Sequence, residues 1–282
     1  MEAIKLSWSR QDVEQRLGIP GGKYTRVNTW FTALLGVIVT LLCIGVLLLF
    51  RDSFISQMFL VRGMYVPYCI VFLTAWSFVV LFVKWRKLAF QRKSLRHLVI
   101  PQESDFVLSS TTVEEVINNV YATVDDPKYF TLYNRITVAL SNLRNLGRVT
   151  DVDDILRSQA EHDESVMETS YALLRSFVWA IPVLGFIGTV LGLSQAIGGF
   201  GSVLETADDI SQIKDSLQDV TGGLATAFET TLQALVAALL IQLTLAFLKK
   251  SEEEFLDECQ AYCAKHIVNR LRIMPFEQTV EE

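Results

Sequence analysis

The stretch that decides the fold is FVWAIPVLGFIGTVLGLSQAIGGF (residues 177–200), followed after an acidic spacer by GGLATAFETTLQALVAALLIQLTLAF (residues 222–247). Each half is apolar over the roughly 20 residues that a helix needs to cross about 30 Å of hydrocarbon. Threonine, glutamine and one glutamate nevertheless occur within these apolar segments. Hydrocarbon offers such groups no hydrogen bonds, so the two segments predict membrane helices that border a polar path or pack tightly against each other.

Two further apolar segments lie nearer the N-terminus. Hydrophobic residues make up 51% of the 282-residue chain, a composition typical of a membrane protein with a soluble portion. We therefore expect an all-α membrane protein with four transmembrane helices, at about 30–50, 64–83, 177–197 and 224–248. No cleavable signal is evident before the first span, which is predicted to be an anchor.

Basic residues cluster on one side of the predicted spans. They precede the first and third spans and follow the second and fourth, whereas the opposite loops hold only Arg51, Arg62 and Lys214. The positive-inside rule therefore places both termini in the cytoplasm. The expected organisation is a cytoplasmic arm at 1–29, spans one and two at 30–83, a helical cytoplasmic domain at 84–176, a channel core of spans three and four at 177–248, and a C-terminal helix at 249–282.

The cytoplasmic domain is predicted to be helical. Thr112 and Glu115 have the spacing of a capping box ahead of an apolar periodic run. No Pro or Gly occurs between Asp151, a predicted helix cap, and Ile181. We therefore expect the third transmembrane helix to be continuous with a long cytoplasmic helix.

The chain has four cysteines. Cys43 and Cys69 lie within predicted spans, where they are expected to pack as small apolar residues. Cys259, Cys263 and His266 share roughly one face of the C-terminal helix. A zinc site would need a fourth ligand in a closed tetrahedron, so free thiols on a packed face are the favoured interpretation and a metal site is the alternative.

One face of the third span is small and polar. On a helical wheel it collects Pro182, Gly185, Gly188, Thr189 and Gly192. Gly188 and Gly192 form a small-xxx-small pair that allows close helix approach, so packing explains the glycines as well as an ion path does. Pro182 removes a backbone donor and favours a bend.

The fourth span carries polar groups on two faces. Thr226, Glu229 and Thr230 share one face, and Thr231 lies nearly opposite among alanines. Glu229 is about 30 Å along a helix from Lys249, near the outer boundary of the membrane. It is either an interfacial or salt-bridged residue, or part of a cation relay or partner contact.

These residues resemble the MotA/TolQ/ExbB proton channel family. The segment AIPVLGFIGTVLGL at 180–193 carries the family's Pro-x-x-Gly-x-x-Gly-Thr-x-x-Gly pattern. The segment GGLATAFETTLQALVAAL at 222–239 is similar to the family's second helix, whose mid-membrane threonine is best matched by Thr231, with Thr230 beside it. The similarity covers about 175–250.

The resemblance implies a homopentamer in the bacterial inner membrane, around a dimer of a MotB/TolR/ExbD-like protein. That single-span partner supplies an essential membrane aspartate. Thr189 and Thr231 would line the ion path, with Thr230 and Glu229 beside them, and Pro182 would couple ion passage to helix movement. The translocated ion is H⁺, with Na⁺ as the alternative, and no cofactor or metal is expected.

The sequence thus predicts a non-enzymatic ion-channel subunit, the stator of a molecular motor that converts ion-motive force into mechanical motion. The alternatives are a sodium-driven version, a membrane scaffold and a solute transporter. The driven machine stays open among flagellar rotation, outer-membrane energisation, gliding and defence. No phosphate loop, H-E-x-x-H motif or nucleophile elbow appears. Lipids are expected partners, and nucleic acid is not, because no basic stripe interleaved with aromatic residues is present.

Overall fold

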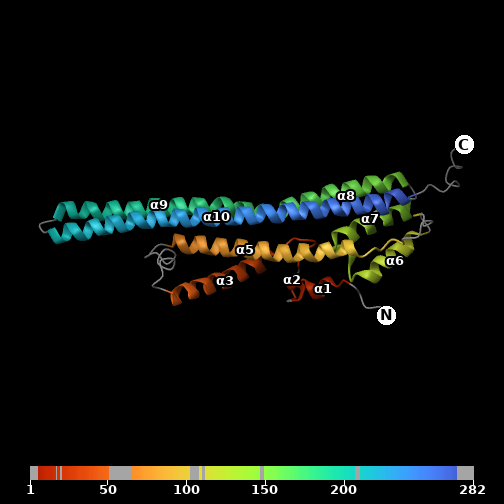
Figure 1. The fold of residues 1–282 in the computed structure, drawn as a ribbon, viewed down its shortest axis with the longest axis horizontal. Helices are drawn as coiled ribbons and strands as arrows, with labels where there is room; N and C mark the ends of the chain where they lie inside the picture. The colour runs from red at the N-terminus through yellow and green to blue at the C-terminus, as the bar shows by residue number, and fades with distance from the viewer. Residues whose placement is uncertain are drawn as a thin grey trace. The chain divides into compact units, whose positions relative to one another are not determined.

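The described part of the chain is mainly helical. The computed structural model describes residues 6–16, 18–19, 21–50, 65–101, 108–109, 112–146, 149–206 and 210–271. Within these residues the chain forms helices and no strand, which confirms the predicted all-α class. Figure 1 shows the order of the helices along the chain.

Two compact units can be distinguished. We call one the span unit, which comprises Thr29–Leu81 and Ala172–Phe247. The other is the head unit, which comprises Met1–Asn28, Phe82–Tyr171 and Leu248–Glu282. Helices α5 and α10 contribute residues to both units.

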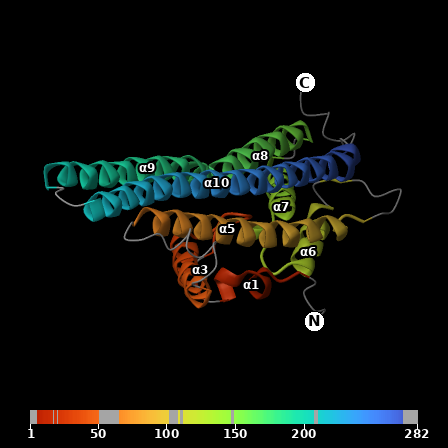
Figure 2. The same ribbon diagram turned by 60° about the vertical axis from the view of Figure 1, so that its left-hand side comes forward.

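Four helices of the described chain are long and apolar enough to cross a membrane, as the hydropathy predicts. They contain α3 (Thr29–Leu49), α5 (Val66–Gln91), α9 (Ala172–Thr206) and α10 (Ile210–His266). Helices α9 and α10 lie side by side in Figures 1 and 2. They form the hairpin that the opening stretch of sequence predicts.

Both hairpin helices are longer than a bilayer requires. At 1.5 Å per residue, the 35 residues of α9 and the 57 residues of α10 span about 50 Å and 85 Å. The acidic spacer is mostly helical, because α9 continues to Thr206 and α10 begins at Ile210; Asp208 and Asp209 lie outside the described residues. Of the C-terminal helix predicted at 249–282, residues 249–266 form the last part of α10, and residues 272–282 lie outside the described residues. No Pro or Gly separates Lys249 from His266, so nothing local ends the helix.

The expected continuous helix from the head into the third span is interrupted at one residue. Helix α8 (Val149–Ser170) ends where Tyr171 forms a turn, and α9 begins at Ala172. The Tyr171 N–H donates to the carbonyl of Glu168, three residues earlier, at 3.2 Å. This pattern closes a tighter turn than the four-residue spacing of an α-helix. Tyr171 is fully buried and bonded to Glu252, so tertiary contacts favour the turn.

Helix α3 packs through a narrow stripe of small residues. Thr32, Gly36 and Thr40 are buried, whereas most of its large apolar side chains are exposed. A Cβ on Gly36 would lie 3.0 Å from Trp76 Cβ, and Trp76 Nε1 donates to Thr32 Oγ1 at 3.3 Å. Trp76 also packs on Phe177 of α9, with the ring centroids 4.7 Å apart.

The head unit is a cluster of short helices around the ends of α5 and α10. Its elements are α1 (Trp8–Gln11), α2 (Val13–Arg16), α6 (Val113–Thr123), α7 (Thr131–Leu146) and α8, with 3-10 turns at Arg92–Arg96, Pro127–Tyr129 and Val268–Arg270. Trp8 is buried among Phe90, Tyr129 and Phe130. The Asp125 carboxylate accepts the backbone N–H groups of Trp8 and Ser9. These contacts fix the N-terminal arm to the core.

Two helix starts differ from the prediction. Thr112 precedes α6, but its hydroxyl accepts the Ser109 N–H at 2.9 Å and makes no cap bond to the helix. Such local turns compete with capping for a threonine side chain. Helix α8 begins at Val149, so Asp151 is its third residue and not its cap.

The cysteines divide into two pairs. Cys43 and Cys69 are exposed on the single chain, contrary to the packing expected of them. Cys259 and Cys263 are buried in the head core, where burial raises the pKa of both thiols, to about 12 for Cys263. Among the described residues, His266 included, no three His, Cys, Asp or Glu side chains gather as a metal site would require.

Candidate functional site

The glycines of α9 face α10 at very short range. A Cβ on Gly185 would lie 2.5 Å from Ala234 Cβ, and one on Gly188 would lie 2.7 Å from Thr230 Oγ1. Real Cβ atoms do not approach other heavy atoms so closely. The two helices therefore meet backbone against backbone, as small residues allow in membrane helix pairs.

The contact continues one turn further along both helices. A Cβ on Gly192 would lie 3.0 Å from the Gly223 carbonyl oxygen, and one on Gly223 would lie 3.0 Å from Ala196 Cβ. We call the interface lined by Gly185, Gly188 and Gly192 the glycine seam. It joins the two sequence motifs that the hairpin contributes.

The two adjacent threonines of α10 occupy different environments. Thr230 is fully buried, and its hydroxyl donates to the Ala227 carbonyl at 3.0 Å. Thr231 is half-buried and donates both to Ala227 and, across the seam, to the Gly185 carbonyl at 3.1 Å. Thr231 thus ties α10 to α9 through a hydroxyl group.

Thr189 and Glu229 are less buried than Thr230. Both are half-buried, and the Thr189 hydroxyl donates to the Phe186 carbonyl of its own helix at 2.6 Å. No hydrogen bond within the described chain joins it to Thr230 or Thr231. The single chain therefore gathers the glycines with the two adjacent threonines, and leaves Thr189 and Glu229 partly accessible.

Pro182 lies inside α9, one turn before the seam. It has no N–H to donate, so the Val178 carbonyl lacks its regular helical partner. In a membrane helix such a freed group is met by neighbouring helices, side chains or local adjustments. Helix α9 therefore lacks one backbone hydrogen bond just before the seam.

Gln233 is a further buried polar residue of α10 that the sequence did not single out as a site. It follows Thr230 by three residues and is 4% exposed. Neither atom of its amide has a hydrogen-bond partner within the described chain. A buried unpaired amide costs about 1–3 kcal/mol. Its position on the polar face of the fourth span is the signal that could have identified it.

The outer faces of α9 and α10 are strongly apolar. Large side chains that the single chain leaves exposed include Trp179, Phe186, Val190, Phe228, Leu232, Leu239 and Phe247. Continuous apolar surfaces of this kind face lipid or other protein chains. The hairpin therefore combines a tight internal seam with surfaces that suit a membrane.

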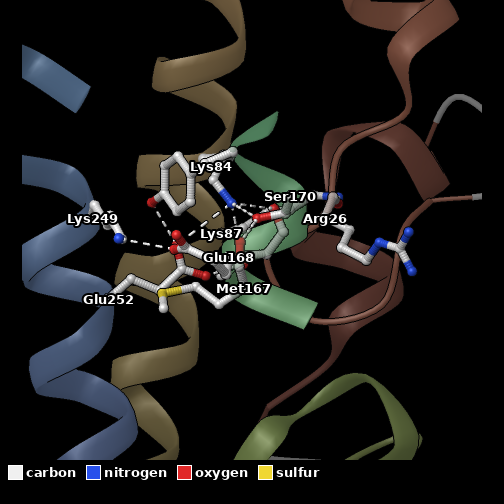
Figure 3. Close-up of polar contacts among 10 residues, drawn as sticks. Arg26, Lys84, Lys87, Met167, Glu168, Ser170, Lys249 and Glu252 are labelled. Atoms are coloured by element: carbon white, nitrogen blue, oxygen red, sulfur yellow. Dashed lines mark hydrogen bonds and ion pairs between the residues drawn. The ribbon is translucent and has the colours of Figure 1, made fainter. Parts of the chain in front are cut away.

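A buried charged network, which the sequence did not predict, lies within the head unit. Lys84 of α5 is 1% exposed and forms an ion pair of 3.5 Å with Glu252 of α10. Tyr171 donates its hydroxyl proton to Glu252 at 2.6 Å, and Thr25 also donates to that carboxylate. Figure 3 shows Lys84 and Glu252 converging from the two helices, with Ser170 beside them. A buried ion pair of this kind depends on such additional hydrogen bonds.

A second buried ion pair lies one turn along α5. Lys87 donates to Glu14 at 2.6 Å and to the Arg26 carbonyl at 2.8 Å, and it lies 3.5 Å from Asp12. Burial raises the pKa of Asp12 against the opposing attraction of Lys87. The basic residues after the second span indicated only orientation in the sequence. Two of them, Lys84 and Lys87, are in fact buried anchors for the N-terminal arm.

Comparison with known proteins bears on the same helices. Residues 132–261 match the model of the MotA/TolQ/ExbB proton channel family, which confirms the resemblance seen in the sequence. The match includes α7, α8, α9 and most of α10, so it extends beyond the 175–250 segment that carries the motifs. No match was found among curated proteins or among solved structures.

Proposed function

We propose that this chain is the ion-channel subunit of a motor driven by the ion-motive force, because residues 132–261 match the model of the MotA/TolQ/ExbB proton channel family. The translocated ion is H⁺. The chain is not an enzyme and needs no cofactor. It works with a single-span partner that carries a membrane aspartate.

One observation carries the proposal more than any other. The two sequence motifs that resemble the family meet in space, because the Thr231 hydroxyl donates to the Gly185 carbonyl beside the contact of Gly188 with Thr230. A hydroxyl that is half-buried beside a close helix contact is suited to exchange hydrogen bonds with a passing ion or a partner side chain. The geometry thus supports Thr231 as a lining residue of the ion path.

The other predicted residues follow from the same geometry. Thr189 and Glu229 are partly accessible, which supports a role for both beside the path, where the partner's aspartate would lie. Thr230 is buried under Gly188, and its role is to hold the seam. Pro182 weakens α9 at one end of the seam, where helix movement would couple to ion passage.

The membrane potential sets the free energy that one translocated ion supplies. A membrane potential of 100 mV is worth about 2.3 kcal/mol per charge, to which the concentration difference adds. Several ions per cycle can therefore move a load. The proposed assembly is a homopentamer around a partner dimer in a bacterial inner membrane, and the exposed apolar faces of α9 and α10 would supply its lateral contacts.

The test is ion flux in reconstituted vesicles. The chain alone is expected to conduct poorly, and coexpression with a partner bearing one membrane aspartate is expected to restore pH-dependent flux. Thr189→Val and Thr231→Val should each lower this flux at least about tenfold, the loss of roughly one charge-assisted hydrogen bond. Thr244→Val is the matched control, because Thr244 is an exposed threonine of α10 whose hydroxyl donates to the Leu240 carbonyl of its own helix.

The alternatives predict other outcomes. A scaffold would keep its function with valine at both sites. A transporter would carry solute without any partner. A sodium-driven motor would respond to the sodium gradient at constant pH. Robust ion conduction by the chain alone would contradict the two-component channel.

A further inference from the structure

A pocket in the head unit is lined in part by the chain segment that leads into the first span. It has a volume of about 720 Å³, within the range of small-molecule sites. The segment Gly22–Asn28 forms one wall, and Asn134 of α7 with Gln159, His162 and Val166 of α8 forms the other. The first span, α3, begins at the next residue, Thr29.

The lining of this pocket is rich in donors. Lys23 and Arg26 contribute two fixed positive charges, and His162 adds a group that can become positive. Side-chain amides come from Asn28, Asn134 and Gln159. None of the ten described lining residues is acidic. In a chain of net charge −6, a pocket with this lining selects for an anion.

The two cations have no competing partner among the residues that the structure describes. Neither Lys23 nor Arg26 forms a side-chain hydrogen bond or ion pair within the described chain. Figure 3 shows the Arg26 guanidinium pointing away from Lys84 and Glu252. Both charges are therefore available to a ligand, with a guanidinium that can bind phosphate in bidentate fashion.

Hydrogen bonds from two buried lysines hold the backbone of the segment that carries these cations. The Arg26 carbonyl accepts a hydrogen bond from Lys87, and the Thr25 carbonyl accepts one from Lys84. Tyr24 has a positive φ of 57°, an uncommon conformation for a large residue, and its hydroxyl accepts from Asn134 at 2.8 Å. The two buried lysines thus fix the backbone of the turn, while its cationic side chains extend from it.

We propose that this pocket binds a phosphate group, through Lys23 and Arg26 with the neighbouring side-chain amides. The phosphate can be carried by an anionic lipid headgroup or by a soluble phosphate compound. The lining segment Gly22–Asn28 leads directly along the chain into the first span at Thr29, which favours the lipid, since basic segments next to a membrane span bind acidic headgroups. The site is separate from the glycine seam and does not depend on the proposed ion path.

The experiment uses the full chain in neutral detergent. Native mass spectrometry counts retained phosphatidylglycerol against phosphatidylcholine, and equilibrium dialysis measures inorganic pyrophosphate. The double variant Lys23→Gln/Arg26→Gln removes the charges but keeps the Arg26 carbonyl that Lys87 binds. The matched control is Arg86→Gln/Arg96→Gln, which removes two exposed charges of the head unit outside the pocket.

The expected result is at least about a tenfold loss of affinity in the pocket variant, from the loss of two charge-assisted contacts, and less than twofold in the control. Selective loss of phosphatidylglycerol supports a lipid site, and selective loss of pyrophosphate supports a soluble ligand. Equal effects of the two double variants, or binding of neither probe, would overturn the proposal. Because flux is measured separately, failure here leaves the proposed channel function untouched.

Discussion

A methyl group at Gly188 would lie 2.7 Å from Thr230 Oγ1 and 3.0 Å from Thr230 Cβ. Thr230 is fully buried and bonded to Ala227, so it has no room to withdraw. Gly188→Ala is therefore expected to destabilise the hairpin by about 1–3 kcal/mol, the usual cost of overpacking. Thermal unfolding of the full chain in detergent measures this loss.

Gly198 of α9 provides the matched control. A Cβ there meets nothing within 4 Å, so Gly198→Ala should keep or raise stability by up to about 1 kcal/mol through helix propensity. The double variant Gly188→Ala/Thr230→Ala should recover part of the loss, because the neighbours are then coupled. If Gly188→Ala and Gly198→Ala are equally stable, the glycine seam is not closely packed.

Glu252 is the residue on which the buried network of the head unit depends. Removing its carboxylate leaves Lys84 charged and buried without its ion pair. Glu252→Ala is expected to cost about 3–5 kcal/mol, the typical penalty for breaking a buried pair. The free energy of unfolding of the full chain is the quantity to measure.

Glu254 is the control that distinguishes loss of a buried ion pair from loss of an exposed one. Glu254 lies 3.7 Å from Arg92 with both side chains substantially exposed, so Glu254→Ala should change stability by no more than about 1 kcal/mol. The double variant Lys84→Met/Glu252→Leu should be more stable than Glu252→Ala, because no buried charge then remains. Equal losses for Glu252→Ala and Glu254→Ala would contradict the buried network.

At the scale of the helix, Pro182 is expected to lower the stability of α9 and to allow the helix to bend. Restoring a backbone donor with Pro182→Ala should stabilise α9, by up to the roughly 3 kcal/mol that an interior proline costs. The same change should lower ion flux in the assembled channel, because a stiffer helix resists the proposed coupling motion. Thermal unfolding and vesicle flux are measured on the same preparation.

Pro67 is the control for this helix prediction. It is the second residue of α5, where proline sacrifices no helical hydrogen bond. Pro67→Ala should therefore bring no comparable gain in stability. Unchanged flux in a stabilised Pro182→Ala variant would show that bending at this point is not needed for ion passage.

The sequence predicted the elements better than their ends. Hydropathy located all four spans because about 20 apolar residues are a strong and local signal. The turn at Tyr171 could not be predicted, since it depends on a hydrogen bond to Glu252, 81 residues away. The continuity of α10 through Lys249 was likewise missed, because a change from apolar to charged residues marks a membrane boundary and does not end a helix.

The candidate site was likewise predictable in part from the sequence. The small face of α9 follows from helical periodicity, and the structure places it against α10. Which threonine reaches across the seam required coordinates, because Thr230 and Thr231 are adjacent in sequence and differ only by a rotation of about 100°. Lys84 and Lys87 look like surface charges in the sequence, and only the packing of the N-terminal arm buries them.

At the scale of the whole molecule, the distribution of charge predicts that the head and the hairpin end lie on opposite sides of the membrane. Lys128 is an exposed residue of the head unit, and Lys214 is an exposed residue near the start of α10. Each is replaced by cysteine in a variant that lacks the four native cysteines. The label is a membrane-impermeant maleimide.

In spheroplasts, Lys214→Cys is expected to react and Lys128→Cys to stay unlabelled, because the positive-inside rule places in the cytoplasm the span ends that Lys and Arg residues flank, and the head unit continues from those ends. Inverted vesicles should reverse the pattern, and detergent should expose both thiols, which controls for burial of either site. About 35 residues of α10 separate Lys214 from Lys249, roughly 50 Å of helix and ample to cross the bilayer core. Labelling of both thiols from the same side would rule out the four-span topology on which an ion path through the glycine seam depends.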